Sequence, residues 1–383
     1  MGIYLALKEI WRNRGRFFLF SLVIALITVL VLFIAALADG LGNGNKEYIE
    51  KLNGDLIVYK ANVDLSIPTS RVDRGKRTET LRVPGVKDVG QASFSSVVLL
   101  HGENKKLNVA LIGVEPGKPG EPPVVQGRGL TEKRGKEAII DRNVALRTNL
   151  HVGDDLTIKS IQGTQEEFFV LRIVGVSDGR QYSLQPSVIV PHLTFDLIKP
   201  GTPATGNETD LISNVLIVQL QDPANWKNMA VAVEEQVNDV RAVDRKTAYE
   251  NTPGYSAQQS TLNTQNFFSL LIGILVIGGF FQIQMLQKVP QIGMLKAIGA
   301  PNGTIGIAAL TQIIIVTVVG VAIGTALTLL LSLTFPATVP IVFSPNAILL
   351  GIGSLLLVGP IGGLVSIRYA LRVEPLTALG LAS

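Results

Sequence analysis

Hydrophobic positions gather in four long blocks, separated by polar stretches of very different length. The blocks cover residues 17–38, 267–286, 305–335 and 347–367, and none of them contains a charged residue. A helix needs about 20 apolar residues to cross a bilayer. The pattern therefore predicts a membrane protein with four transmembrane α-helices in a 1 + 3 arrangement, one near the N-terminus and three toward the C-terminus.

The long segment between the first and second blocks has a different pattern. GDLIVYK, SSVVLLHG, KLNVALIGV, FFVLRIVGV, SVIVPHL and NVLIVQL read as strands. DPANWKNMAVAVEEQVNDV instead predicts an amphipathic helix, with Trp226, Met229, Val233 and Val237 on one face. Mixed strand and helix patterns predict a large α+β domain over 40–266. Residues 1–39 then form the N-terminus with the first span, and 267–383 form the other three spans.

The distribution of charge predicts which segments lie in the cytoplasm. The two ends and the 288–304 loop carry eight Lys and Arg residues against Glu9 and Glu374, whereas residues 40–266 carry 26 basic and 27 acidic residues. Short cytoplasmic loops are enriched in Lys and Arg. We therefore expect both termini in the cytoplasm of a multi-pass protein of the cell (inner or plasma) membrane, with 40–266 outside. The net charge of +4 reflects topology and predicts no nucleic-acid partner.

The N-terminal block has an alternative interpretation as a cleaved secretory signal. A basic segment precedes it, and Ala-Leu-Ala before Asp39 fits the small-residue pattern of a cleavage site. However, the apolar stretch of 17–38 is longer than the roughly 7–15 residues of a signal peptide. An uncleaved first membrane helix is the favoured interpretation.

Residue types needed for catalysis or metal binding are absent or scattered. The chain has no cysteine, and its three histidines, His101, His151 and His192, are far apart in the sequence. Metal ligands usually show clustered spacing, so each histidine is interpreted as a surface or packing residue. No nucleotide-binding G-x-x-x-x-G-K-[ST] motif occurs. We expect a non-catalytic subunit that binds no cofactor directly. If the protein uses the energy of ATP, the nucleotide and its Mg²⁺ must lie on a partner chain.

A short polar interruption, KVPQIGMLKAIGAPNGT over 288–304, separates the second and third blocks. The apolar side chains of Ile292, Leu295 and Ile298 recur at helical spacing, with Met294 nearby. Pro290 fits the first turn of a helix and Gly299 fits its end. A short amphipathic helix over 288–300 is therefore predicted at the cytoplasmic face. It can either dock in a groove of a partner protein or lie among the lipid headgroups, and the pattern fits both.

The interrupting loop resembles the signature loop of the FtsX/MacB family of ABC-transporter permeases. That family also has one membrane helix, a large extracytoplasmic domain and three further membrane helices. Its C-terminus often resembles ALRVEPLTALG, Ala370–Gly380, and the phrases VALIGVEP and FFVLRIVGV resemble MacB-type periplasmic core segments. The resemblance extends over the whole architecture of the chain.

The resemblance implies that the loop is a coupling helix, which in this family docks on a separate ATPase subunit. The implied coupling residues are Lys288, Pro290, Gln291, Ile292, Gly293, Met294, Leu295, Lys296 and Ile298. The family commonly has Glu where this chain has Gln291. A Gln keeps the capacity for hydrogen bonding at that position but loses an ionic contact.

Together these features predict the permease subunit of an ATP-driven ABC transporter for efflux or extraction. Expected partners are an ABC ATPase subunit, a second copy of the chain and membrane lipid. Because the spanning blocks carry no charge, the cargo is expected to be amphipathic or lipidic, such as haem, a lipid or lipoprotein, a drug or a peptide. The alternatives are an FtsX-like regulatory scaffold that activates an extracytoplasmic enzyme, and a membrane-anchored binding protein without an ATPase.

The segment around the first block, from LALKEIWRNRGRFFLF to ALADGLGNGN, resembles haem-exporting members of the family. If the first helix continues outward, Asp39, Glu47, Tyr48 and Glu50 follow within about three turns. Carboxylates or tyrosines paired across a homodimer can ligate haem iron, so these four residues are a candidate cargo site. The alternative is that they only solvate the exit of a membrane helix.

Two small-residue motifs mark candidate helix contacts. Gly320 and Gly324 form G-x-x-x-G in the third block, and Gly359 and Gly363 form it in the fourth. This spacing lets two helix backbones approach closely. The alternative is the ordinary glycine richness of membrane helices.

Overall fold

The chain divides into two compact units. The computed structural model describes residues 2–102, 105–200, 212–335 and 341–372. Unit 1 comprises Met1–Gly40 and Gln259–Ser383, and unit 2 comprises Leu41–Gln258. The C-terminal stretch that resembles the family, Ala370–Gly380, lies mostly outside the described residues.

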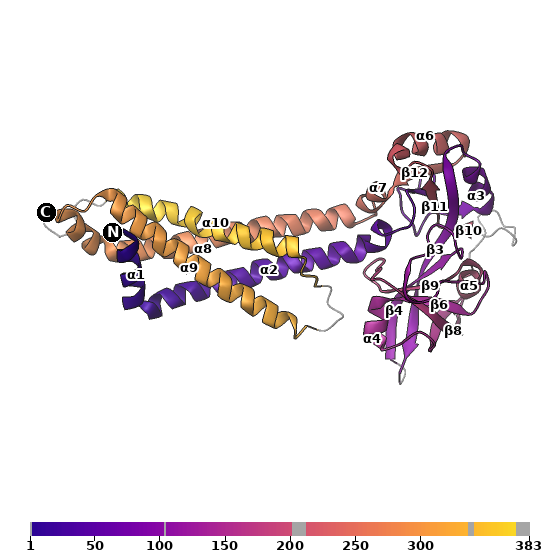
Figure 1. Ribbon diagram of the computed structural model, residues 1–383, viewed down its shortest axis with the longest axis horizontal. Coiled ribbons are helices and arrows are strands. Elements are labelled where there is room, and N and C mark those ends of the chain that lie inside the picture. Colours follow the sequence, from indigo (N-terminus) through magenta and orange to yellow (C-terminus); the bar gives the residue numbers. More distant parts are fainter. Residues whose placement is uncertain (1, 103–104, 201–211, 336–340, 373–383) are drawn as a thin grey trace. The chain divides into compact units, whose positions relative to one another are not determined.

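Unit 1 is helical. Figure 1 shows its helices α1, α2, α8, α9 and α10. Their bounds are α1 Gly2–Arg12, α2 Arg14–Glu50, α8 Tyr255–Ala297, α9 Asn302–Ser332 and α10 Pro345–Arg372. Within the described residues, α2, α8 and α9 are long and apolar enough to cross a membrane, whereas the apolar part of α10 is the shorter stretch Ile348–Leu364. Three of the predicted spans thus lie on helices of sufficient length, and the fourth stays a prediction.

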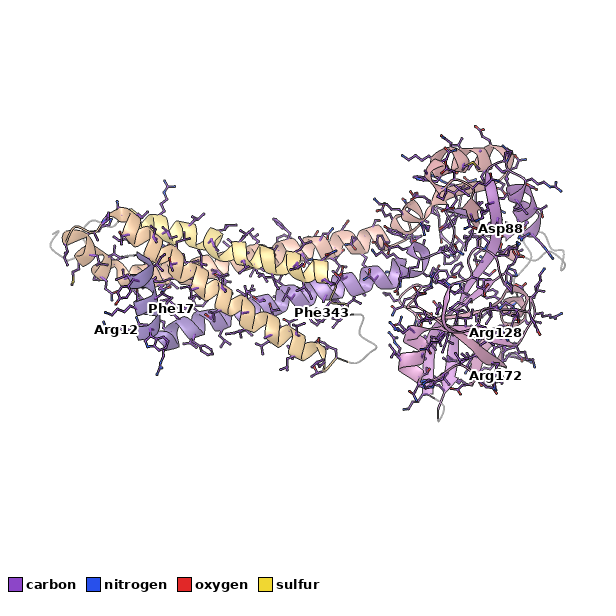
Figure 2. The ribbon with its side chains drawn as sticks, in the orientation of Figure 1. Arg12, Phe17, Asp88, Arg128, Arg172 and Phe343 are labelled. Carbon is purple, nitrogen blue, oxygen red and sulfur yellow. The ribbon has the colours of Figure 1, made fainter. Side chains whose placement is uncertain are left out.

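The helices of unit 1 share one apolar core. Ile24 of α2, Phe281 of α8, Ile313 of α9 and Leu355 of α10 all belong to it and are almost fully buried. A break at Asn13 separates α1 from α2, with Arg12 and Phe17 on either side of it (Figure 2). On α1, the small residues Gly2 and Ala6 are buried. Helix α1 therefore packs closely against α9, where a Cβ on Gly2 would meet Thr304 and Ile307.

The end of α8 differs from the prediction for the 288–304 loop. The helix runs from the apolar segment to Ala297 without interruption, and Pro290 lies in its interior. The prediction that Pro290 opens a separate short helix was therefore wrong, because the helical pattern continues across the proline. The predicted end is confirmed: Gly299 has φ +95°, and the amides of Gly299 and Ala300 donate to the carbonyls of Lys296 and Leu295. This is a Schellman motif, which only a left-handed residue such as glycine completes easily.

Unit 2 is built on a ten-stranded mixed sheet within its described residues, in the order β12-β1-β11-β3-β4-β9-β6-β8-β5, with β7 pairing β3 and β8. The strands are β1 Leu56–Lys60, β3 Val86–His101, β4 Lys105–Val114, β5 Val124–Gly127, β6 Glu137–Asp141, β7 Asp155–Gln162, β8 Gln165–Ser177, β9 Ser187–Pro191, β11 Val215–Leu220 and β12 Val240–Asp244. A separate pair joins β2 Val72–Asp73 to β10 Ile212–Ser213. Short helices complete the α+β unit: α3 Arg74–Leu81, α4 Arg142–Thr148, α5 His192–Ile198, η1 Pro223–Asn225, α6 Trp226–Gln236 and α7 Arg245–Glu250.

Alternation along the strands places their side chains in separate cores. On β1, Ile57 and Tyr59 enter one buried cluster, whereas Leu56 and Val58 enter another. The second cluster also contains residues of the predicted amphipathic helix: Met229, Val233, Val237 and, partly buried, Trp226. The predicted apolar face of this helix is confirmed. Both faces of β1 are buried because α6 covers one of them.

Candidate functional site

The C-terminal end of α8 exposes only part of the residue set implied by the coupling-helix resemblance. Gln291 is exposed, and the side chains of Met294 and Ile298 are 56% and 81% exposed. Pro290 is exposed too, so these four residues lie on one side of the helix. We call Pro290, Gln291, Met294 and Ile298 the coupling face. It is apolar except for one carboxamide.

The other residues of the implied set face inward or only partly outward. Ile292 is 6% exposed and packs with Met285, Ile305 and Ala309, and Gly293 is buried beside it. Leu295 is half-buried, and Nζ of Lys296 donates to the carbonyl oxygen of Leu371, at the end of α10, over 2.8 Å. Lys288 is directed to Glu9 and Gln312. The prediction that all nine implied residues form one docking surface was therefore wrong, because a helix can present only one side to a partner.

Helix α1 carries an exposed apolar face that the sequence analysis missed. Ile3, Tyr4, Leu7 and Trp11 are 57%, 70%, 52% and 80% exposed. Their spacing follows one side of a helix, and basic residues follow in the chain up to Arg16. A helix with an apolar face and basic flanks is suited to the lipid–water interface. The spacing of these four residues was the signal that could have revealed it.

Tyr48, one of the four candidate cargo residues, is a core residue of unit 2. Its exposed fraction is 0%, its ring packs edge-on against Phe94 at 5.4 Å, and its hydroxyl donates to the carbonyl oxygen of Gly120 over 3.3 Å. Burial raises the pKa of the Tyr48 hydroxyl far above its usual range. A tyrosinate ligand at this position would require opening the core. Neither the ligand role nor the role of solvating a helix exit fits this placement.

The three candidate carboxylates have different surroundings. Glu47 accepts hydrogen bonds from Nζ of Lys51 at 2.7 Å and from the amide of Gln181 at 3.1 Å. Glu50 is 51% exposed and pairs with Lys46. Asp39 is half-buried on α2 and makes no hydrogen bond or ion pair with the described residues. Because Glu47 has a structural role, Asp39 and Glu50 are the carboxylates open to a ligand.

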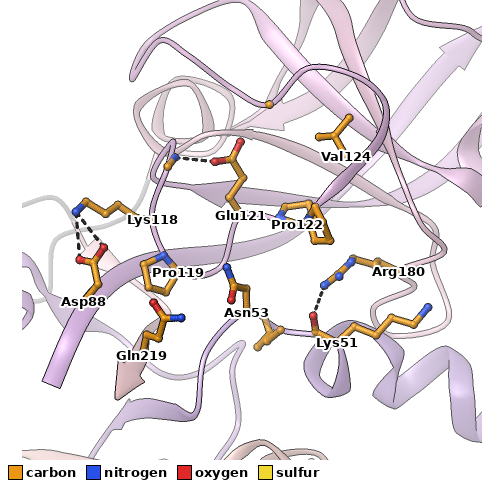
Figure 3. Close-up of a pocket in the computed structure, with 14 residues that line it drawn as sticks. Lys51, Asn53, Asp88, Lys118, Pro119, Glu121, Pro122, Val124, Arg180 and Gln219 are labelled. Carbon is orange, nitrogen blue, oxygen red and sulfur yellow. Dashed lines mark hydrogen bonds and ion pairs between the residues drawn. The ribbon is translucent and has the colours of Figure 1, made fainter. Parts of the chain in front are cut away.

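Unit 2 contains an open pocket of about 720 Å³, which is within the size range of small-molecule sites. Figure 3 shows its polar groups. Nζ of Lys118 lies 3.1 Å from Asp88, and Nη1 of Arg180 donates to the carbonyl oxygen of Lys51 at 2.5 Å. The side chains of Asn53 and Gln219 have no hydrogen-bond partner among the described residues. Paired charges and two free carboxamides suit a neutral polar ligand better than an ion.

A buried row of polar side chains places His192 inside unit 2. Oγ of Ser93 lies 3.3 Å from Nε2 of His192, and Nδ1 of His192 lies 3.4 Å from Asp196. Ser93 and His192 are only 2% and 4% exposed, so a substrate has no access to them. The interpretation of His192 as a packing residue is confirmed. Over the described part of the chain, no three His, Asp or Glu residues gather to hold a metal ion.

Two family models together match almost the whole chain. The MacB-like periplasmic core domain matches residues 17–236, and the FtsX-like permease C-terminal domain matches residues 264–375. A membrane unit combined with this sheet-based unit defines the class of ABC-transporter permeases. The chain belongs to the family of FtsX-like permeases that carry a MacB-like periplasmic core domain, and it is a membrane protein.

Relatives of this chain have permease names. HrtB of Staphylococcus haemolyticus, named for a hemin transport system, is 27% identical over 376 residues, which cover 98% of this chain and 99% of HrtB. An uncharacterized ABC transporter permease of Mycobacterium tuberculosis is 24% identical over 396 residues, 99% of each chain. The macrolide export ATP-binding/permease protein MacB 1/2 of Paracoccus denitrificans is 24% identical over 321 residues, 78% of this chain and 46% of that protein.

Proposed function

We propose that this chain is the permease subunit of an ATP-driven exporter, coupled to a separate ATPase through the coupling face. The observation that carries the proposal is the continuity of α2. One unbroken helix contains the apolar segment of unit 1 and ends in the core of unit 2. A stiff helix of this kind can transmit motion from a membrane segment to an extracytoplasmic domain. In the proposed topology, both termini and the coupling face lie in the cytoplasm.

The last turns of α2 are firmly held by unit 2, which supports a force-transmitting role. The amide of Tyr48 donates to the carbonyl oxygen of Gln181 over 3.1 Å, and the amide of Leu184 donates to that of Gly44 over 3.0 Å. Nζ of Lys51 donates to the carbonyl oxygen of Gly179 over 2.6 Å. Segment 179–184 thus wraps the end of α2, and displacing this helix would displace the segment with it.

Helix α8 begins with weaker attachment to unit 2. It follows Gly254, whose φ of +86° makes a turn, and most residues of its first three turns are exposed or half-buried. Within unit 2, Tyr255 packs against Tyr249 with the ring centroids 5.8 Å apart, and Gln258 bonds Asn45 of α2 at 2.8 Å. We therefore propose that α2 transmits the motion and that the start of α8 guides it.

The coupling face is the proposed contact with the ATPase. Exposed Met294 and Ile298 offer apolar area near the centre of such a contact, and a helix laid in a groove is a common mode of recognition. Two permease copies and two ATPase subunits are the proposed assembly. The regulatory-scaffold alternative is not favoured, because the relatives that align over the whole chain carry transport names.

We propose haemin as the cargo, expelled from the membrane. The name of HrtB and its alignment over nearly the whole chain support this choice. Haemin is flat and amphipathic, which fits spanning helices whose apolar segments carry no charge. Asp39 is the proposed contact residue, because it combines a free carboxylate with a place at the end of the apolar part of α2.

The test of the proposed function is co-purification in detergent with candidate ABC ATPase subunits co-expressed from the same organism. We expect a stable complex with equal numbers of the two chains, recovered on size-exclusion chromatography. Recovery of the permease free of any ATPase, under conditions where both are folded, would overturn the proposal. That result would favour the anchored binding protein instead.

A further inference from the structure

Three polar side chains from three helices of unit 1 close a ring of hydrogen bonds. They are Glu9 on α1, Lys288 on α8 and Gln312 on α9. Nζ of Lys288 lies 2.5 Å from Oε1 of Glu9 and donates to Oε1 of Gln312 at 2.7 Å, while Nε2 of Gln312 donates to Oε2 of Glu9 at 2.8 Å. Each side chain therefore bonds both of the others. We call these residues the polar triad.

The polar triad is shielded from solvent. The side chains of Lys288 and Glu9 are 12% and 24% exposed, and Gln312 is 2% exposed on a helix that carries no charged residue. The ammonium of Lys288 also lies 5.5 Å from the ring centre of Phe17 on α2. Four helices thus meet around one cation. In such surroundings a buried charge without its partner is strongly unfavourable. The side chains of the triad therefore have few other low-energy conformations.

The position of the triad along α8 suggests its purpose. Lys288 is two residues before Pro290, where the helix lacks an amide donor and is therefore weakened. The coupling face begins at this weak point. Beyond it, Ile292 is buried against α9, and Lys296 bonds the end of α10. The end of α8 is therefore fastened on both sides of the proline.

We propose that Glu9, Lys288 and Gln312 are positioning residues, which keep the end of α8 from bending at Pro290 and so hold the coupling face in one place relative to α1 and α9. This inference rests on the proposed function, because a fixed face matters only if a partner pushes on it. Force applied there then moves α1, α8 and α9 together. Without the triad, the same force would bend α8 locally.

Gln312 makes two hydrogen bonds of opposite direction, which neither a charged nor an apolar side chain can replace. Its carboxamide accepts from Lys288 and donates to Glu9 at once, so both of its functional atoms are used. A Leu would leave the ion pair in place but unsupported on one side. Gln312→Leu is therefore the variant that loosens the triad without stranding a charge.

The first experiment measures the position of the coupling face directly. Because the chain has no cysteine, spin labels can be attached at single introduced cysteines, Tyr4→Cys on α1 and Ile298→Cys on α8, both at exposed positions. Double electron–electron resonance on the labelled full chain, diluted with excess unlabelled permease in lipid nanodiscs, should give one narrow distance distribution within a single chain. Gln312→Leu should broaden it at least twofold, while Gln287→Leu, an exposed control on the same helix, should not.

The charge pair is tested by reversal, which also guards against simple misfolding. Glu9→Lys alone should broaden the distribution or prevent folding, and the double variant Glu9→Lys with Lys288→Glu should restore the narrow distribution. If the distribution stays as narrow in Gln312→Leu as in the unsubstituted chain, the proposal is overturned. The proposal is also overturned if the charge-reversed double variant fails to restore the narrow distance distribution.

A second readout separates positioning from docking. With the partner ATPase bound, Gln312→Leu should keep complex recovery but lose at least fivefold of the ATPase stimulation by the permease. Unchanged stimulation would overturn the positioning role. Failure of the unsubstituted chain to bind any ATPase would overturn the proposed function, yet the distance measurement would still decide whether the triad holds α8 in place.

Discussion

Gly320 of α9 lies directly against Ile24 of α2: a Cβ atom built on Gly320 would be 2.6 Å from the Ile24 Cβ, too close for any side chain. One turn along α9, a Cβ on Gly324 would lie 2.5 Å from that of Thr28. On α10, Gly359 and Gly363 leave equally little room before α9. Both G-x-x-x-G motifs are therefore at helix contacts within one chain, as their spacing predicts.

Adding a single methyl group at this contact should destabilise unit 1. Gly320→Ala forces α2 and α9 apart, and overpacking of this kind typically costs about 1–3 kcal/mol. We expect a lower thermal unfolding midpoint in detergent than for the unsubstituted chain. The matched control is Gly353→Ala on α10, where an added Cβ has nothing within 4 Å. If both variants melt alike, close packing at Gly320 is not what stabilises this helix pair.

A charge on the coupling face should prevent association with the ATPase. Met294 is 56% exposed on the apolar side of the α8 end, so Met294→Asp would place a carboxylate in the proposed apolar contact. We expect normal membrane insertion and at least a tenfold loss of ATPase recovered in co-purification. Gln287→Asp adds the same charge at an exposed position of the same helix and should have little effect. Equal recovery with both variants would contradict docking through Met294.

Asp39 and Tyr48 should have opposite importance for haemin binding. Asp39→Asn removes the free carboxylate on α2. We expect haemin to bind at least fivefold more weakly, measured from the saturable shift of its Soret band on titration. Tyr48→Phe removes a hydroxyl that bonds Gly120 inside the core, so binding should be unchanged. A shift lost in Tyr48→Phe but kept in Asp39→Asn would reverse our assignment.

Asp141 predicts how the stability of unit 2 depends on pH. Burial raises the pKa of its carboxyl from 3.8 to about 7, although the amides of Val144 and Ser187 donate to it. The folded state therefore binds more protons than the unfolded state in this interval. The contribution to stability is fully present below pH 3.8 and is lost as the pH rises toward 7.

The substitution Asp141→Asn removes this titration while keeping an acceptor for the start of α4. Thermal midpoints of both proteins, measured between pH 4.5 and about 7.5, should diverge, with the unsubstituted chain losing stability relative to the variant as the pH increases. Parallel curves across this interval would show that Asp141 does not titrate there.

The sequence predicted the strands and the amphipathic helix well because their periodicity records burial directly. Met229 and Val233 on one helix face, and alternation along β1, required no knowledge of distant contacts. It missed β5, because only its pairing with β8 makes Val124–Gly127 a strand. Tertiary contacts decide such short edge segments.

The candidate site was harder to predict because local spacing does not show which side of a helix a neighbour covers. Ile292 and Met294 look alike in the sequence, but α9 buries the first and leaves the second exposed. Lys288 likewise reads as polar surface, whereas its partners, Glu9 and Gln312, are distant along the chain. Tyr48 was misplaced for the same reason: its contacts come from Phe94 and Gly120.

We propose that this permease couples an ATPase to the movement of haemin. The most direct test of this proposal is the rate of ATP hydrolysis by the partner ATPase, measured alone, with the permease in lipid nanodiscs, and with its Met294→Asp variant, each across a haemin titration. We expect the unsubstituted permease to raise the rate of ATP hydrolysis severalfold and haemin to change that rate saturably, whereas the variant should do neither. A rate that is the same with and without the permease, at every haemin concentration, would contradict the proposal.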